Sequence, residues 1–127
     1  MTHISGTFEV EKEADMIYEI RDYHYRKDLF DEYKAWAEEA VPVLKDVLDV
    51  VGFWIDTGTE PEVRGTDPVD SPIGHANVTW IIRWEDQAAR EENLPKALSS
   101  EAWQAVWAKH PDPGGYQQLM SRFMESM

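Results

Sequence analysis

The order in which hydrophobic periodicity changes along the chain constrains its fold more than any single motif. Residues 16–25 are rich in β-branched and aromatic side chains, which predicts a strand. Residues 27–49 repeat apolar side chains every three or four positions, which predicts an amphipathic helix. Further segments follow as two short strands, a helical region and a last strand, at 50–56, 75–84, 85–110 and 116–124. This β-α-β-β-α-β order is that of a ferredoxin-like α+β fold, a four-stranded antiparallel sheet with helices on one face.

Turn and cap residues give these segments expected boundaries. Asp28 is expected to cap the first helix and Ser100 the last one, because short polar side chains bind free amides there. Pro42 is expected to kink the first helix or to start a fresh turn there, and Pro95 to interrupt the second helix. Residues 57–74 hold three prolines and three glycines without periodicity, a length of loop that is often a lid or a flap for a partner.

Composition narrows the class of protein. The 127 residues fit one domain, expected at 16–127, after a loose arm or short strand at 1–15. Twenty-five acidic and twelve basic residues give a net charge of −13, which argues against nucleic acid and anionic membranes as partners. Without a membrane-length apolar run or a leader pattern, a cytoplasmic protein is expected. The sequence has no cysteine and no nucleotide fingerprint, so neither a disulfide nor a bound organic cofactor is predicted.

The third predicted strand carries large apolar side chains in both phases of its alternation. Trp80, Ile82 and Trp84 share one face, and Ile81 lies on the other. If helices cover one face of the sheet, the other still exposes apolar side chains, which usually marks an interface. We therefore expect a homodimer that packs through the open sheet face.

Four short motifs resemble the NIPSNAP family in their order and spacing. "IYEIRDY" resembles the first strand of NIPSNAP domains, which often begin with Tyr-Glu-x-Arg-x-Tyr, and "VVGFW" resembles their second strand. "IIRWEDQAARE" is similar to their third strand with the turn into an arginine-bearing helix, and "LSSEAW" to a later helix start. The resemblance covers residues 16 to about 110. It departs at Trp80, where members often have a histidine, and in the length of the 57–74 loop.

Membership of this family implies the dimeric α+β barrel superfamily. That superfamily includes cofactor-independent monooxygenases, haem-degrading enzymes, polyketide cyclases and muconolactone isomerase-like proteins, so likeness of fold alone does not select an activity. In such barrels the gap between sheet and helices is commonly the ligand pocket. Two functions stay open: an enzyme acting on an aromatic or polyketide-like substrate, or a non-catalytic dimeric binding or accessory protein.

The first strand supplies the candidate acid–base groups. We expect the phase of Tyr18, Ile20, Asp22 and His24 to pack under the helices, which would place His24 at the pocket mouth. A histidine there could exchange a proton with a phenol, enol or quinol, or it could be a partly exposed strand end. The candidate catalytic residues are His24, His75, Tyr23 and Tyr25. His24 and His75 show no short ligand spacing, so no metal site is predicted.

Ligand contacts are expected from one charged pair and from the aromatic side chains. Arg21, next to Glu19 on one strand face, either anchors a ligand carboxylate or forms an ion pair that fixes the dimer register. An interior rich in aromatic rings suits planar, apolar ligands. The candidate binding residues are Arg21, Asp22, Tyr33, Trp36, Trp54, Trp80 and Trp103.

Overall fold

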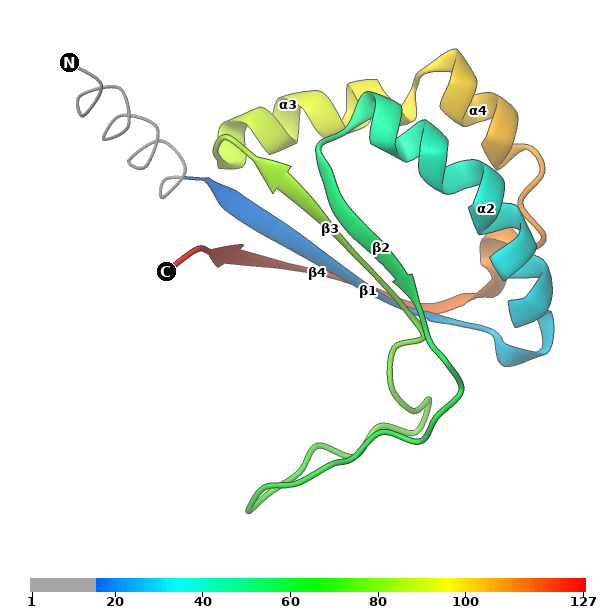
Figure 1. The fold of residues 1–127 in the computed structure, drawn as a ribbon, viewed down its shortest axis with the longest axis vertical. Coiled ribbons are helices and arrows are strands. Elements are labelled where there is room, and N and C mark those ends of the chain that lie inside the picture. The colour runs from blue at the N-terminus through cyan, green and yellow to red at the C-terminus, as the bar shows by residue number, and fades with distance from the viewer. Residues whose placement is uncertain (1–15) are drawn as a thin grey trace.

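The computed structural model describes residues 16–127, so the arm expected at 1–15 lies outside the described residues. The helices and strands are β1 (Ile17–Tyr25), η1 (Lys27–Leu29), α2 (Phe30–Val47), β2 (Val50–Ile55), β3 (Val78–Trp84), α3 (Gln87–Leu98), α4 (Glu101–Trp107), η2 (Pro113–Gly115) and β4 (Tyr116–Glu125). Figure 1 shows α2, α3 and α4 together on one side of the sheet. The predicted α+β class and order of elements are confirmed.

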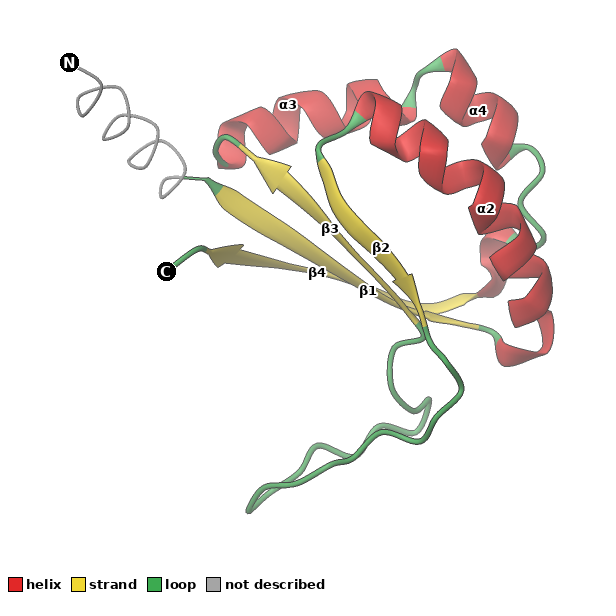
Figure 2. Cartoon of the chain, viewed as in Figure 1, coloured by secondary structure: helices red, strands yellow, loops and turns green. Residues whose placement is uncertain are grey.

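The four strands form one antiparallel sheet in the order β2-β3-β1-β4. The first and third strands are therefore neighbours, as the ferredoxin-like order predicts, and β1 lies in the middle between β3 and β4. Figure 2 shows the sheet as one layer and the helices as the second. Within the part of the chain that the structure describes, no helix combines the length and the apolar character needed to cross a membrane.

Helix α2 continues through Pro42 without a break, and α3 continues through Pro95, so the expected interruption at Pro95 is wrong. A proline removes one backbone hydrogen bond from a helix. The neighbours Leu94 and Ala97 are buried in the core and hold this turn of α3 against it. Ser100 caps α4 as expected, because its hydroxyl accepts from the amide of Trp103 at 3.2 Å. Asp28 does not cap α2; its carboxylate binds Arg26 instead.

The apolar side of α2 packs on the sheet and on α4. The buried side chains recur at helical spacing, at Tyr33, Trp36, Ala37, Ala40 and Leu44. The indole Nε1 of Trp36 donates to the backbone oxygen of Val106 at 2.8 Å, which fastens α2 to α4. The hydrogen bond satisfies a buried polar atom, so the large ring can sit in the core at little cost.

The face of β1 that meets the helices is the opposite of the expected one. Arg21 pairs with Trp80 across the ladder, and Glu19 pairs with Ile82, so the phase of Glu19, Arg21 and Tyr23 shares a face with the buried side of β3. The assignment of Ile20 to the helix side is therefore wrong. The more polar phase is the buried one because its charged groups neutralise one another inside the fold.

Residues 56–77 leave the sheet as a long loop between β2 and β3 and extend away from the helices (Figure 1). Its two ends meet, because the amide of Asp56 donates to the backbone oxygen of Asn77 at 2.9 Å. Next to this stem, the side chain of Asn77 accepts from the amide of Tyr25 at 2.9 Å and donates to the oxygen of Tyr25 at 2.8 Å. Asn77 thereby extends the β1–β3 ladder by one side-chain pair.

Replacing Asn77 by alanine should destabilise the fold. Asn77→Ala would leave the buried amide and carbonyl of Tyr25 without partners, and we expect the free energy of unfolding to fall by about 2 kcal/mol. Urea denaturation measures this difference. The exposed Asn93→Ala serves as the matched control, and an equal effect of the two substitutions would contradict the role given to Asn77.

Candidate functional site

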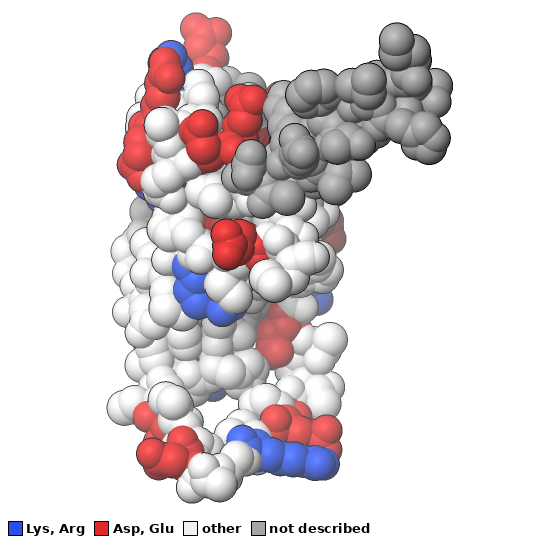
Figure 3. All heavy atoms as spheres, turned by 90° about the vertical axis from the view of Figure 1, so that its left-hand side faces the viewer, with Lys and Arg blue, Asp and Glu red and all other residues white. Residues whose placement is uncertain are grey.

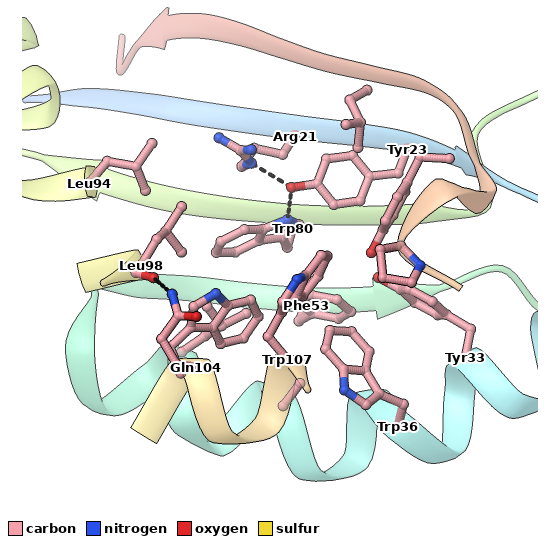
Figure 4. Close-up of a pocket in the computed structure, with 16 residues that line it drawn as sticks. Arg21, Tyr23, Tyr33, Trp36, Phe53, Trp80, Leu94, Leu98, Gln104 and Trp107 are labelled. Atoms are coloured by element: carbon pink, nitrogen blue, oxygen red, sulfur yellow. Dashed lines mark hydrogen bonds between the residues drawn. The ribbon is translucent and has the colours of Figure 1, made fainter. Parts of the chain in front are cut away.

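A cavity of about 440 Å³ lies between the sheet and the helices. Its walls come from all four strands and from helices α2, α3 and α4. Figure 4 labels lining side chains of β1, β2, β3 and the three helices. The apolar lining consists of Trp36, Ala40, Leu44, Phe53, Trp80, Leu94, Leu98, Trp103, Trp107, Pro113 and Leu119. The polar lining consists of Arg21, Tyr23, Tyr33, Gln104 and Tyr116. A mostly aromatic wall with few polar groups is typical of a site for a small organic ligand.

The polar end of the cavity rests on a carboxylate without solvent exposure. Glu19 is 0% exposed, and its oxygens accept from Arg21 Nη1 at 2.7 Å, Arg90 Nη2 at 3.0 Å and Trp84 Nε1 at 3.0 Å. Burial works against the charge of Glu19, yet the hydrogen bonds from Arg90 and the charge of Arg21 outweigh it and lower the pKa to about 2. Glu19 is therefore ionised, and its ion pair with Arg21 fixes the position of that side chain.

Arg21, which is fixed by Glu19, in turn fixes the hydroxyl of Tyr23 by a hydrogen bond. Its Nε donates to the Tyr23 hydroxyl oxygen at 2.6 Å, and Trp80 Nε1 donates to the same oxygen at 2.9 Å. Figure 4 shows both hydrogen bonds meeting at the Tyr23 oxygen beside the cavity. An arginine and an indole can only donate, so Tyr23 accepts twice and keeps its own hydrogen for another acceptor. The Arg21 guanidinium also lies 5.4 Å from the centre of the Trp80 ring, a cation–π contact.

His110 and Tyr116, the first residue of β4, form a second polar group at the cavity. His110 Nδ1 accepts from the amide of Asp112 at 3.1 Å, which leaves the hydrogen of the neutral ring on Nε2. Nε2 then donates to the Tyr116 hydroxyl at 2.8 Å. Burial lowers the pKa of His110 although the charge of Asp112 opposes the shift, so the neutral ring is favoured. The His110 ring is held 4.4 Å from the Trp36 ring and 4.5 Å from the Trp107 ring.

Several of the predicted ligand contacts come together in the cavity. Arg21, Tyr33, Trp36, Trp80 and Trp103 all line it, although they come from β1, α2, β3 and α4. Of the four candidate catalytic residues, Tyr23 lines the cavity. Arg21 and Tyr23 reach it from the phase of β1 that was expected to face away.

The other candidates lie elsewhere. His24 and Asp22 are on the opposite face of β1, where His24 Nε2 bonds the oxygen of Gly74 at 3.1 Å and Asp22 accepts from Thr79 at 2.7 Å. His75 is in the loop and lies 3.3 Å from Asp56, without an interaction with His24. The placements of His24 and Asp22 follow from the reversed face of β1, whereas His75 belongs to the loop between β2 and β3.

Tyr25 and Trp54 are also outside the cavity wall. The Tyr25 side chain is buried, and its hydroxyl donates to the backbone oxygen of Asp112 at 2.9 Å. Trp54 is 50% exposed, and its ring lies over Gly52, where a Cβ would meet the ring at 2.5 Å. Gly52 therefore leaves the space in which the Trp54 ring lies flat on the sheet.

Sequence reasoning missed Arg90, Trp107, His110 and Tyr116. Trp107 belongs to an apolar helical stripe that is equally typical of plain core packing. Arg90 reaches Glu19 across 71 positions of the chain, and no local pattern announces such a pair. His110 and Tyr116 flank the "PDPGG" turn, which has no periodicity. The one available signal was Tyr116, an aromatic residue directly after this turn.

The ionised Glu19 makes stability depend on pH in a defined window. The pKa of Glu19 drops from a usual 4.5 to about 2 on folding, so its stabilising effect is complete above pH 4.5 and is lost as the pH falls toward 2. The loss should amount to about 3 kcal/mol of unfolding free energy. We expect Glu19→Gln to be less stable near neutral pH and to lack this component in acid denaturation.

The exposed Glu60→Gln is the matched control for that titration. Chemical denaturation at a series of pH values compares the two variants with the parent chain. Equal acid sensitivity of Glu19→Gln and the parent would show that Glu19 is not held ionised by folding.

Solved structures of NIPSNAP family proteins have a similar fold. One from Agrobacterium tumefaciens matches with a TM-score of 0.66 and 17% identity, over 88% of this chain and 86% of that chain. An uncharacterised NIPSNAP-like domain protein from Burkholderia xenovorans matches with 0.64 and 20%, over 90% and 87%. Another A. tumefaciens NIPSNAP family protein, of unknown function, matches with 0.63 and 21%, over 89% of both chains.

No protein-family model matches the sequence, and no curated protein matches it. Because about one residue in five is identical, the structural likeness shows a shared fold and nothing beyond it. It agrees with the resemblance of the strand and helix motifs in residues 16 to about 110. The chain therefore folds as a NIPSNAP-like domain.

Proposed function

We propose that the chain binds a small aromatic or polyketide-like molecule between the sheet and the helices. The observation that carries this proposal is the aromatic cavity with Arg21 and Tyr23 at one end. Its volume of about 440 Å³ falls within the usual range of ligand pockets. Trp80 and Phe53 on the sheet and Trp36 on α2 line the cavity with aromatic surface that suits a planar ligand.

The Tyr23 hydroxyl is the group best placed to hold a ligand oxygen. Because it already accepts from Arg21 and Trp80, it can offer only its hydrogen, and among residues 16–127 no acceptor for that hydrogen is recorded. The nearby positive charge of Arg21 strengthens such a donor. A carbonyl or enol oxygen bound here would satisfy the hydroxyl, while the apolar body of the ligand fills the aromatic part of the cavity.

This arrangement supports binding directly and catalysis through one residue. In a cofactor-independent enzyme of the isomerase, cyclase or monooxygenase type, Tyr23 would be the proton donor to a bound oxygen and Arg21 would stabilise negative charge there. His24 and His75 lie outside the cavity, so the histidine-based version of such an enzyme loses its geometric support. The non-catalytic alternative is a binding or accessory protein that uses the same cavity.

Calorimetry with 1-tetralone, a bicyclic ketone with one acceptor oxygen, tests the proposed site. We expect saturable binding, weakened about tenfold in Tyr23→Phe because the carbonyl loses its donor. Tyr18→Phe makes the same chemical change on the opposite sheet face and should keep the affinity of the parent chain. Absence of binding, or equal affinity of the two variants, would contradict a site at Tyr23.

We also propose that two copies of the chain associate through the open face of the sheet. That face carries a row of partly exposed apolar side chains at Ile20, Trp54, Ile81, Met120 and Met124. Figure 3 looks at the left-hand side of the view in Figure 1 and shows uncharged surface in the middle, interrupted by a few acidic and basic side chains, with more charged groups above and below. A second copy would cover these side chains with an identical apolar surface.

Sedimentation of Ile81→Glu tests this interface. Ile81 faces outward from the central part of β3, so a buried charge there should convert a dimer of the parent chain into monomers. Val69→Glu places the same charge in the loop at a side chain that is 92% exposed and should sediment like the parent. A monomeric parent chain, or a dimeric Ile81→Glu, would rule out association through this face.

A further inference from the structure

A second tyrosine hydroxyl in the cavity, that of Tyr116, also accepts a hydrogen bond from the protein. Tyr116 lines the cavity and accepts from His110 Nε2 at 2.8 Å. The direction of this bond is fixed, since His110 Nδ1 is occupied by the amide of Asp112 and the ring hydrogen must sit on Nε2.

The hydrogen of the Tyr116 hydroxyl is not used in the bond with His110, because the Tyr116 oxygen is the acceptor there. Burial raises the pKa of the Tyr33 and Tyr116 phenols, so both keep their hydrogens. Within residues 16–127 the Tyr116 hydroxyl makes no hydrogen bond besides the one from His110. Tyr33 and Tyr116 both line the cavity, so the Tyr116 hydrogen is available to a ligand there.

Two side chains that line the cavity, Arg21 and Gln104, carry nitrogen donors. Arg21 donates from Nε to Tyr23 and from Nη1 to Glu19, and its Nη2 group has no hydrogen bond to any of the described residues. The side-chain nitrogen of Gln104 donates to the backbone oxygen of Leu98 at 2.9 Å. Gln104 itself is exposed to solvent on α4. The wall thus offers hydrogen-bond donors at two places, at Tyr23 with Arg21 and at Tyr116.

We infer that the cavity selects planar ligands that present two separate acceptor oxygens, such as quinones and aromatic diketones, one oxygen at Tyr23 with Arg21 and the other at Tyr116. This inference rests on the proposed function, because it concerns the ligand of the same site. His110 is a positioning residue in it: it never reaches the ligand but holds the Tyr116 oxygen so that the phenolic hydrogen stays free. A ligand with one acceptor would leave one of the two hydroxyls unpaired, which costs affinity.

The test compares 1,4-naphthoquinone, with two carbonyl oxygens, against 1-tetralone, with one carbonyl on a bicyclic frame of similar size. In calorimetry the parent chain should bind the quinone at least about fivefold more tightly, the gain expected for one further hydrogen bond. The sequence has no cysteine, so thiol addition to the quinone does not interfere. Tyr116→Phe should bring the affinity ratio close to one, and Tyr18→Phe, the matched control, should keep it.

The outcomes separate the two claims. If 1-tetralone binds and the quinone binds no more tightly, the inference about two acceptors is overturned while the proposed site stands. If Tyr116→Phe keeps the full ratio, the second acceptor site is not at Tyr116 and the inference is equally overturned. If neither compound binds the parent chain, the proposed function itself fails.

Discussion

The arrangement of sheet and helices depends on one carboxylate that is kept ionised without contact to water. Glu19 lies on β1, accepts from Trp84 on β3 and from Arg90 on α3, and so ties two strands and a helix together at one point. A buried charge is tolerated only when paired donors replace its hydration. Arg21 is one of these donors, and its remaining groups turn toward the cavity. The structural anchor and the polar end of the binding site are thus parts of one network.

The sequence was informative about order and pairing and misleading about orientation. Alternation and helical spacing predicted the elements, and the ferredoxin-like order predicted that β1 and β3 are neighbours. The side of β1 that meets the helices could not be deduced, because its inner phase of Glu19, Arg21 and Tyr23 is more polar than its outer phase. Its burial is stable only with Arg90, which lies far along the chain, and local patterns contain no information on such a partner.

The candidate site divides in the same way. Trp36 and Trp80 could be predicted, because aromatic side chains on the inner faces of a helix and a central strand border any gap between the two layers. Tyr116 and His110 could not, since they flank an irregular turn whose path is set by tertiary contacts such as the hydrogen bond from Tyr25 to Asp112. Two histidines illustrate the point. His24, in the first strand, faces away from the cavity, whereas His110, beside the turn, binds the cavity residue Tyr116.

The stem of the long loop separates a variable part of the chain from a fixed one. Asp56 and Asn77 close the loop with a backbone hydrogen bond directly beside the sheet, and none of the residues between them lines the cavity. The entropy of closing such a loop grows only with the logarithm of its length, so residues can be added or removed beyond the stem at small thermodynamic cost. This segment is therefore a natural insertion point, where a reporter peptide or a recognition sequence could be carried without disturbing the hydrogen-bonded layer behind it.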